Sequence, residues 1–316
     1  MKIAVTGASG FIGSKLCKHL SEQNYTVNAS FKSTKNIILK HKKNLNFYKL
    51  DDLSLKNDYL NFFFGVDCVI HCAAIAHIKK SEEKKTINIY EKVNVEWTRT
   101  IAKFAHEAGV KRFIFLSSIG VNGINTKPFQ PFTHKDIPAP KGQYAISKFY
   151  AEEALRKISK LSGLEVVIIR APLVIGSGAK GNFSRLIKLI NFGVPLPFGL
   201  VKNKKSFIGI KNLIDILVCC IKHPDVAGET LLVSDDEDLS TPKLIRQISL
   251  AMERPSYLFP VPIFILKFVC SIVGKKSELD QLLGSLQIDC SYTKKILNYK
   301  SSVSILESIK NMSQVK

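Results

Sequence analysis

Two side chains that can exchange a proton, Tyr144 and Lys148, lie four residues apart. In a helix this spacing places them on one face, one turn apart. A free tyrosine titrates near about 10 and is a poor proton shuttle at neutral pH, but an adjacent ammonium favours the phenolate and lowers that pKa. Ser118 ends a preceding apolar run and can orient a substrate oxygen by hydrogen bonding. These three residues predict acid–base chemistry at a substrate oxygen.

A glycine-rich segment, TGASGFIG (6–13), follows the first apolar run and opens a helix. Gly7 permits a tight turn, Gly10 lets the backbone approach a pyrophosphate, and Gly13 allows close packing of helix on strand. The helix N-terminus then presents free N–H groups and a positive dipole end to the phosphates. The segment predicts a nicotinamide dinucleotide site, and the charge of an oxidised nicotinamide would assist Lys148 in lowering the pKa of Tyr144.

The residues about 20 positions after the glycines indicate which dinucleotide is bound. NAD sites usually carry a carboxylate there, hydrogen-bonded to the ribose 2′-hydroxyl. The window 28–34 (NASFKST) has none, and Lys32 lies where a 2′-phosphate would sit. Because a lysine attracts that phosphate, we expect an acid-free pocket that prefers NADP(H). NAD(H) is the alternative if Lys32 is a solvated residue at a strand end.

The elements that must position these residues alternate between strand and helix. Apolar runs predict strands at 2–6, 25–31, 45–50, 68–73, 112–117 and 165–170, and helices run to about residue 20 and over 91–108 and 143–159. Continuous apolar strands separated by helices predict an α/β fold with a doubly wound parallel sheet. We expect a dinucleotide-binding domain over 1–172. A smaller, mostly helical substrate lobe is expected over 173–316, with part of 205–234 returning to the sheet.

The chain has 316 residues and a formal net charge of +20. Its lysines are scattered, and no long basic tract alternates with aromatic residues, so we expect no nucleic-acid partner. A basic surface attracts anions, which include dinucleotides and nucleotide sugars. The N-terminus has no charged region followed by a long apolar one, so we expect a cytoplasmic protein.

One apolar stretch, residues 258–273, resembles a membrane span. It is shorter than the roughly 20 residues that a span requires, and Pro260, Pro262 and Lys267 interrupt it. We expect no integral span and interpret the stretch as a buried or partner-packing helix. Association with a membrane surface stays open.

Metal chemistry is not indicated. The seven cysteines show no CxxC spacing, and His71, His77 and His134 are expected to be polar surface or capping residues. The acidic run 235–238 lacks the pattern of a calcium loop, so it predicts a solvated turn before a helix capped near Ser240.

Taken together, the chain resembles the extended short-chain dehydrogenase/reductases, the nucleotide-sugar epimerase/dehydratase family, over nearly its whole length. The resemblance rests on TGASGFIG, Asp52-Leu53, HCAA (71–74), Asn94-Val95, SSIGVNG (117–123), YAISK (144–148), RAPLVIGSG (170–178), Asn182-Phe183, PLPFG (195–199), KKSFIGIKNLID (204–215) and DCSYTKKILNYK (289–300). Further segments, NFSRLIKLI, LLVSDDEDLSTPKLI (231–245) and LLGSLQID (282–289), are most similar to UDP-sugar enzymes of bacterial surface-polysaccharide (O-antigen) clusters.

The resemblance implies a Rossmann sheet, a homodimer and roles for individual residues. Ser118, Tyr144 and Lys148 would be the catalytic triad. The cofactor-binding residues would be Gly7, Ser9, Gly10, Phe11, Ile12, Gly13, Lys32, Asp52, Leu53, Cys72, Ala73, Ala74, Asn94 and Pro172. The UDP-sugar would meet Asn182, Phe183, Phe198 and, at its pyrophosphate, Lys205.

Two departures from the family pattern matter. Dehydratases carry an Asp-Glu pair after the catalytic hydroxyl, whereas this chain has Ile119-Gly120, so we expect no 4,6-dehydration. Trp97 stands where relatives often have glycine, and we expect a packing role for it in its helix. The leading hypothesis is reduction of a UDP-4-keto-6-deoxy-N-acetylhexosamine at C4, and the alternative is a UDP-hexose 4-epimerase with tightly bound NAD.

Overall fold

The computed structural model describes residues 1–32, 43–51, 55–76, 89–179, 181–272 and 276–313, and a parallel sheet of seven strands runs through it. In spatial order the strands are β3 (Leu45–Lys49), β2 (Thr26–Phe31), β1 (Lys2–Thr6), β4 (Cys68–His71), β5 (Arg112–Ser118), β6 (Glu165–Ala171) and β9 (Thr230–Leu232). The order reverses between β1 and β4, which is where ligands bind in doubly wound sheets.

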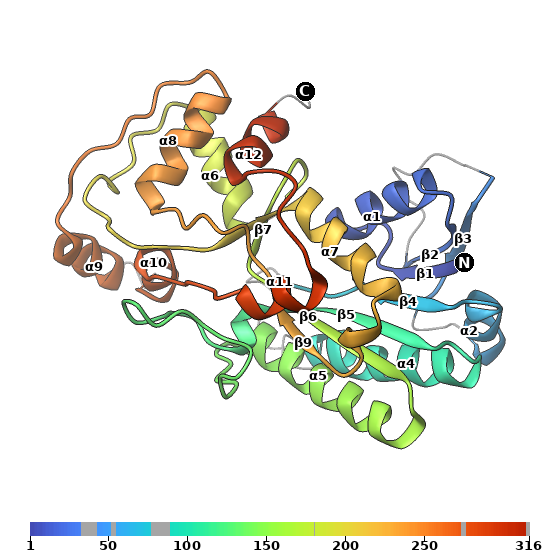
Figure 1. The fold of residues 1–316 in the computed structure, drawn as a ribbon. Coiled ribbons are helices and arrows are strands. Elements are labelled where there is room, and N and C mark those ends of the chain that lie inside the picture. The colour runs from blue at the N-terminus through green and yellow to red at the C-terminus, as the bar shows by residue number, and fades with distance from the viewer. Residues whose placement is uncertain (33–42, 52–54, 77–88, 180, 273–275, 314–316) are drawn as a thin grey trace.

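Helices cover both faces of this sheet (Figure 1). On one face pack α1 (Phe11–Glu22), α7 (Ile210–Lys222) and α11 (Ser291–Leu297). On the other pack α2 (Lys56–Phe63), α4 (Trp97–Glu107) and α5 (Gln143–Ser162). The strands are apolar along their length because both faces are buried. The predicted doubly wound α/β fold is confirmed, and the predicted strands agree with the structure to within two residues at either end.

The remaining elements form the C-terminal lobe around a separate apolar cluster. They are β7 (Leu173–Ile175), β8 (Phe207–Gly209), α6 (Asn182–Asn191), α8 (Thr241–Ala251), α9 (Ile263–Ile272), α10 (Lys276–Leu283) and α12 (Ile305–Ser313). β7 and β8 pair with each other in a small parallel sheet. The chain returns to the main sheet at β9, which pairs with β6. The boundary at residue 172 stays a prediction.

The apolar stretch 258–273 forms α9 at the edge of this lobe (Figure 1). Phe264 is 72% exposed and Ile272 is 71% exposed, so the expectation of a buried helix is wrong, and the alternative of a partner-packing helix stays a prediction. In the part of the chain that the structure describes, no helix is long and apolar enough to cross a bilayer.

A buried ion pair joins α5 to the middle of the sheet. Glu152 on α5 accepts hydrogen bonds from Arg170 of β6 at 2.6 and 3.1 Å, and from the Ser117 hydroxyl of β5 at 2.6 Å. Arg170 also donates to the side chain of Asn122 at 2.9 Å. Both charged side chains are almost fully buried, and these bonds satisfy the charges that burial removes from water.

We expect Glu152→Gln to lower the free energy of unfolding by about 3 kcal/mol or more, because Arg170 would keep a buried charge without its counterion. Glu153→Gln is the matched control, since Glu153 is its exposed neighbour and pairs only with Arg156 in the described ion pairs. Its effect should stay within about 0.5 kcal/mol. Urea unfolding measures both variants. Equal losses would contradict the role of the buried pair.

Candidate functional site

The glycine-rich turn after β1 has the close contacts that its sequence predicts. Gly7 has a φ of +71°, and a Cβ there would lie 2.8 Å from the backbone of Ala73. A Cβ at Gly13 would lie 2.3 Å from the carbonyl oxygen of Gly7. Only glycine fits at either position, and the turn therefore lies directly against the segment that follows β4.

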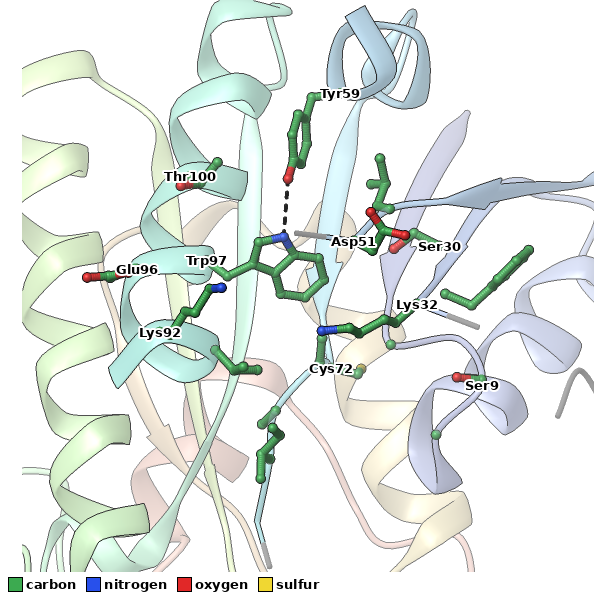
Figure 2. A pocket seen from close by; sticks show the side chains of 18 of the residues that line it. Ser9, Ser30, Lys32, Asp51, Tyr59, Cys72, Lys92, Glu96, Trp97 and Thr100 are labelled. Atoms are coloured by element: carbon green, nitrogen blue, oxygen red, sulfur yellow. Dashed lines mark hydrogen bonds between the residues drawn. The ribbon is translucent and has the colours of Figure 1, made fainter. Parts of the chain in front are cut away.

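A cavity of about 520 Å³ opens at this turn, at the carboxyl ends of β1 to β4 (Figure 2). Its lining comprises Gly7, Ser9, Gly10, Ser30, Phe31, Lys32, Leu50, Asp51, Lys56, Tyr59, Cys72, Ala73, Ala74, Ile75, Lys92, Val93, Glu96, Trp97, Thr100 and Phe104. Seven residues predicted to bind the cofactor are therefore brought together: Gly7, Ser9, Gly10, Lys32, Cys72, Ala73 and Ala74. Asp52 and Leu53 lie outside the described residues, and their neighbour Asp51 lines the cavity.

Four other predicted cofactor residues lie beside this cavity rather than in its lining. Gly13 packs on the turn, and Ile12 packs against the core under the sheet. Phe11 lies against Gly176 and Gly178, and Pro172 is buried between β6 and β7.

The cavity contains both signs of charge. Lys32, Lys56 and Lys92 line it together with Asp51 and Glu96. The acid-free pocket expected around Lys32 is therefore wrong for the cavity as a whole. The reason is tertiary: Asp51 follows β3 and Glu96 precedes α4, so neither lies in the sequence window after the glycines.

Trp97 packs against the apolar core, as expected, and it also belongs to the cavity wall. Its indole points into the cavity, as does the side chain of Lys32, and its N–H donates to the Tyr59 hydroxyl at 3.4 Å (Figure 2). The π-helix Glu91–Glu96 precedes it directly, and such helices occur often at functional sites. Sequence spacing could not reveal this position, because Tyr59 is 38 residues away.

His71 lies beneath Trp97 in the core, whereas a surface or capping position was expected for it. Its ring nitrogens bond the hydroxyls of Thr6 at 2.8 Å and Thr98 at 3.0 Å. Burial lowers the pKa of His71 to about 3, with the Lys148 charge adding to the effect. A neutral imidazole therefore ties β1 to α4, and it is placed as a structural residue. His134 stacks on Tyr292, and His77 lies outside the described residues.

The three predicted catalytic residues lie where β5 ends and α5 begins. Ser118 is the last residue of β5, and its Oγ accepts a hydrogen bond from the Gly120 N–H at 3.1 Å. Tyr144 and Lys148 lie one turn apart in the first turns of α5. The Lys148 ammonium donates to the carbonyl of Leu116 at 2.7 Å and lies 4.2 Å from the ring centroid of Phe115. Lys148 is thereby anchored to the strand that carries Ser118.

The titration of these groups is set by burial. Burial lowers the pKa of Lys148 to about 8, against smaller opposing effects of Cys72 and Glu152. Burial also raises the pKa of Tyr144 to about 12, and Tyr90 adds to the rise. The lowered tyrosine pKa expected from the Tyr-Lys pair is therefore wrong for the protein alone. Its other expected source, the charge of an oxidised nicotinamide, belongs to the cofactor.

Asn94 connects the cavity wall to α5. Its Oδ1 accepts from the Ile75 N–H at 2.9 Å, and its Nδ2 donates to the Ile75 carbonyl at 3.0 Å and to the Ser147 hydroxyl at 2.9 Å. It thus holds the segment after β4, as the resemblance implied. Ser147, which lies between Tyr144 and Lys148, is a positioning residue that sequence reasoning missed.

The predicted substrate residues lie in the C-terminal lobe. Phe183 is buried and Phe198 half-buried in its apolar cluster, and the side chain of Asn182 lies outside the described part. The Lys205 ammonium donates to the carbonyl of Gln281 on α10, and burial lowers the pKa of Lys205 to about 8. The structure places Phe183 and Phe198 in one apolar cluster and Lys205 against α10, and contact of any of these residues with a substrate stays a prediction.

Ile119 and Gly120, which stand where dehydratases carry an Asp-Glu pair, lie beside Ser118. Ile119 is buried against Leu232 and Ile288, and Gly120 binds the Ser118 hydroxyl.

Among the described residues, no group of three His, Cys, Asp or Glu side chains could hold a metal ion. The acidic run differs from the solvated turn expected: Asp235 is buried and accepts from the Gly209 N–H and the Asn212 amide, both at 2.7 Å.

Two solved structures with a similar fold are named as UDP-sugar 4-epimerases. A UDP-glucuronic acid 4-epimerase from Bacillus cereus, in complex with NAD, has a TM-score of 0.81 at 23% identity, covering 99% of this chain and 96% of that one. A Thermotoga maritima UDP-glucose 4-epimerase with UDP-glucose has a TM-score of 0.80 at 20% identity, covering 99% and 98%. These similarities establish the Rossmann-type fold.

The sequence itself establishes the family. Residues 3–233 match the NAD dependent epimerase/dehydratase family, and the chain belongs to it. A Vibrio cholerae protein named UDP-glucose 4-epimerase is 38% identical over 99% of this chain and 94% of its own. An Escherichia coli O157:H7 N-acetyl-α-D-glucosaminyl-diphospho-ditrans,octacis-undecaprenol 4-epimerase is 28% identical over 87% and 81%.

The cavity fits the dinucleotide that this family uses. The glycine turn forms a cradle that a Cβ at Gly7 would fill, and the helix that follows it begins at Phe11. The N–H groups in the first turn of this helix point toward the glycine turn, where the oxygens of a pyrophosphate would accept hydrogen bonds from them. Trp97, Tyr59 and Phe104 provide aromatic surface deeper in the same cavity.

Trp97 is the single tryptophan of the chain, so its fluorescence reports directly on this cavity. We expect saturation with NAD or NADP to quench the indole emission, because the dinucleotide would lie against the ring. Trp97→Phe should abolish the signal while calorimetry still detects binding. Binding seen by calorimetry without any change in the wild-type emission would contradict this position of Trp97.

Burying Lys148 should cost stability at neutral pH. Below pH 8 the lysine is charged both folded and unfolded, so the full penalty of burial applies, and it corresponds to about 3 kcal/mol. Between pH 8 and 10.5 the folded protein has released the proton and the unfolded chain still holds it, so stability rises with pH.

We therefore expect Lys148→Met to increase the free energy of unfolding at pH 7, and this gain should shrink as pH approaches 10.5. Chemical unfolding at pH 7, 9 and 10.5 measures the effect. Lys160→Met, on the exposed end of the same helix, is the control and should show no such trend. A gain that is the same at every pH would contradict the assignment to the Lys148 charge.

Proposed function

We propose that the protein is a UDP-hexose 4-epimerase that works with a retained NAD. The observation that carries the proposal is the buried Lys148 ammonium. It lies one helical turn from Tyr144 and is anchored to β5, the strand that ends in Ser118. The Vibrio cholerae UDP-glucose 4-epimerase, similar over nearly the whole of both chains, supports the choice of reaction. The expected homodimer stays a prediction.

The mechanism follows from what each of the three side chains can donate or accept. Ser118 accepts from the Gly120 N–H, so its own hydroxyl proton can be donated to the oxygen on C4 of the sugar. Tyr144 takes the proton from that hydroxyl group and later returns it. Because burial raises the pKa of Tyr144 in the protein alone, its phenolate would depend on the positive charge of an oxidised nicotinamide together with that of Lys148. A bound NAD supplies the acceptor, and then the donor, of the hydride from C4.

Inversion needs the 4-keto sugar to turn before the hydride returns. The lobe would hold the UDP portion through Asn182, Phe183, Phe198 and Lys205 while the hexose turns. Ser118 and Tyr144 can serve both faces of the sugar, because both act on the oxygen and not on the carbon. The reaction has no net redox change, so it requires no added cofactor.

A second candidate is a 4-ketoreductase that consumes NADPH and acts on a UDP-4-keto-6-deoxy-N-acetylhexosamine. Lys32 in the lining of the cavity favours it, because an ammonium there would attract a 2′-phosphate. The same Ser118, Tyr144 and Lys148 would act, with Tyr144 giving its proton to the 4-keto oxygen.

One experiment separates the two candidates. The purified protein is denatured and the released nicotinamide is identified, and native protein is incubated with UDP-glucose or UDP-N-acetylglucosamine without added cofactor. For the epimerase we expect co-purified NAD and an equilibrium mixture of C4 epimers. No turnover on UDP-hexoses, together with NADPH oxidation on a UDP-4-keto sugar, would establish the reductase instead.

Tyr144→Phe tests the assigned proton shuttle. We expect kcat to fall by about 10²–10⁴ because the proton of the sugar hydroxyl loses its acceptor. Binding of the dinucleotide, measured by Trp97 fluorescence, should be unchanged. Tyr90→Phe is the control, since Tyr90 lies with its ring centroid 6.4 Å from that of Tyr144 but has its hydroxyl bonded to the Ala76 carbonyl. Full activity in Tyr144→Phe would refute the mechanism.

A further inference from the structure

The outer edge of the C-terminal lobe exposes a run of large apolar side chains. Two segments pair there: Leu196 exchanges hydrogen bonds with Tyr257 and Phe259, and Gly199 donates to the Phe259 carbonyl. They run side by side along the lobe toward α9 (Figure 1). We call the exposed part of residues 192–200, 257–260 and α9 the lobe-edge surface.

The side chains of the lobe-edge surface are aromatic and aliphatic. Its exposed members are Phe192, Val194, Leu200, Tyr257, Phe259, Ile263, Phe264, Ile265, Phe268 and Ile272. In α9 Leu266 is buried, whereas Phe264 and Phe268 are 72% and 67% exposed. Soluble monomers rarely expose so many neighbouring apolar residues, and such patches usually mark contact with a protein or a lipid surface.

The two chain segments that contribute most of this surface carry charges of one sign. Residues 182–205 carry five lysines and arginines, residues 254–272 carry two, and neither segment contains an aspartate or glutamate. Lys188, Lys202, Lys204, Arg254 and Lys267 are exposed. Glu253 lies immediately outside the second segment. α10, which packs against α9, adds the half-buried Asp280. An apolar surface whose two segments carry only cations is complementary to a layer of anionic headgroups over hydrocarbon.

We propose that the lobe-edge surface docks on an anionic lipid bilayer, with α9 lying in the plane of the membrane interface. A second copy of the chain fits less well, because two such surfaces would bring the cations of their segments together. Spanning is excluded for α9 itself, since ten residues of helix extend only about 15 Å. The docking is independent of the reaction assigned to the site.

Sedimentation with vesicles tests the proposal. The full chain is mixed with vesicles of phosphatidylcholine alone or of phosphatidylcholine with phosphatidylglycerol, at low and high salt. We expect binding that needs phosphatidylglycerol and weakens with salt. The double variant Phe264→Ser/Phe268→Ser should reduce the partition coefficient about tenfold or more, because both rings lose their burial in the interface.

Matched variants separate docking from general stickiness. Phe64→Ser/Leu161→Ser removes two equally exposed side chains on the sheet domain and should leave vesicle binding unchanged. Lys188→Glu/Lys267→Glu should reduce binding to phosphatidylglycerol vesicles. Thermal unfolding verifies that each variant is folded.

The proposal is overturned if the folded wild-type protein fails to bind phosphatidylglycerol vesicles. If it then forms an oligomer that Phe264→Ser/Phe268→Ser dissociates, a second copy covers this surface. Equal binding of wild type and the Phe264→Ser/Phe268→Ser variant would also overturn it. UDP-hexose conversion measured in the same samples is a separate readout, so loss of docking is distinguishable from failure of the proposed function.

Discussion

The geometry of the site depends on the buried pair of Glu152 and Arg170. Through Ser117, this pair joins α5 to β5 and β6 by hydrogen bonds of 2.6–3.1 Å. β5 ends in Ser118, and α5 carries Tyr144 and Lys148, so the same contacts fix the candidate catalytic side chains relative to one another. A hydroxyl and a phenol must address one oxygen atom, and small displacements are costly for such chemistry. A buried, fully bonded ion pair provides that rigidity.

Much of the sheet could be predicted from the sequence because its strands are continuous apolar runs and the glycine turn has a specific spacing. β7 and β8 were missed, since three residues each are too short to show a period. The positions of the candidate catalytic residues also followed from local spacing. The Glu152–Arg170 pair did not, because it depends on which face of α5 meets the sheet.

Trp97 and α9 show why local patterns fail where tertiary surroundings decide. An apolar helix is normally predicted to be buried, yet among the described side chains of α9 Leu266 is buried and Phe264, Phe268 and Ile272 are exposed. A tryptophan in an amphipathic helix is normally predicted to pack, and Trp97 does so, but its ring also lines the cavity and its N–H donates to Tyr59. In both cases the sequence shows the residue types but not their surroundings, because distant segments of the chain contribute the neighbouring residues.

Lys148 breaks the rule that a buried charge is paired. Among the described residues it forms no salt bridge and has one hydrogen bond, to the Leu116 carbonyl, together with the face of the Phe115 ring. Burial lowers its pKa to about 8, so at neutral pH the ammonium still exists but is poorly compensated. A protein selected for stability alone would place an apolar residue there. A cation one helical turn from a phenol would instead favour negative charge on that phenol, as the proposed proton removal from a sugar hydroxyl requires.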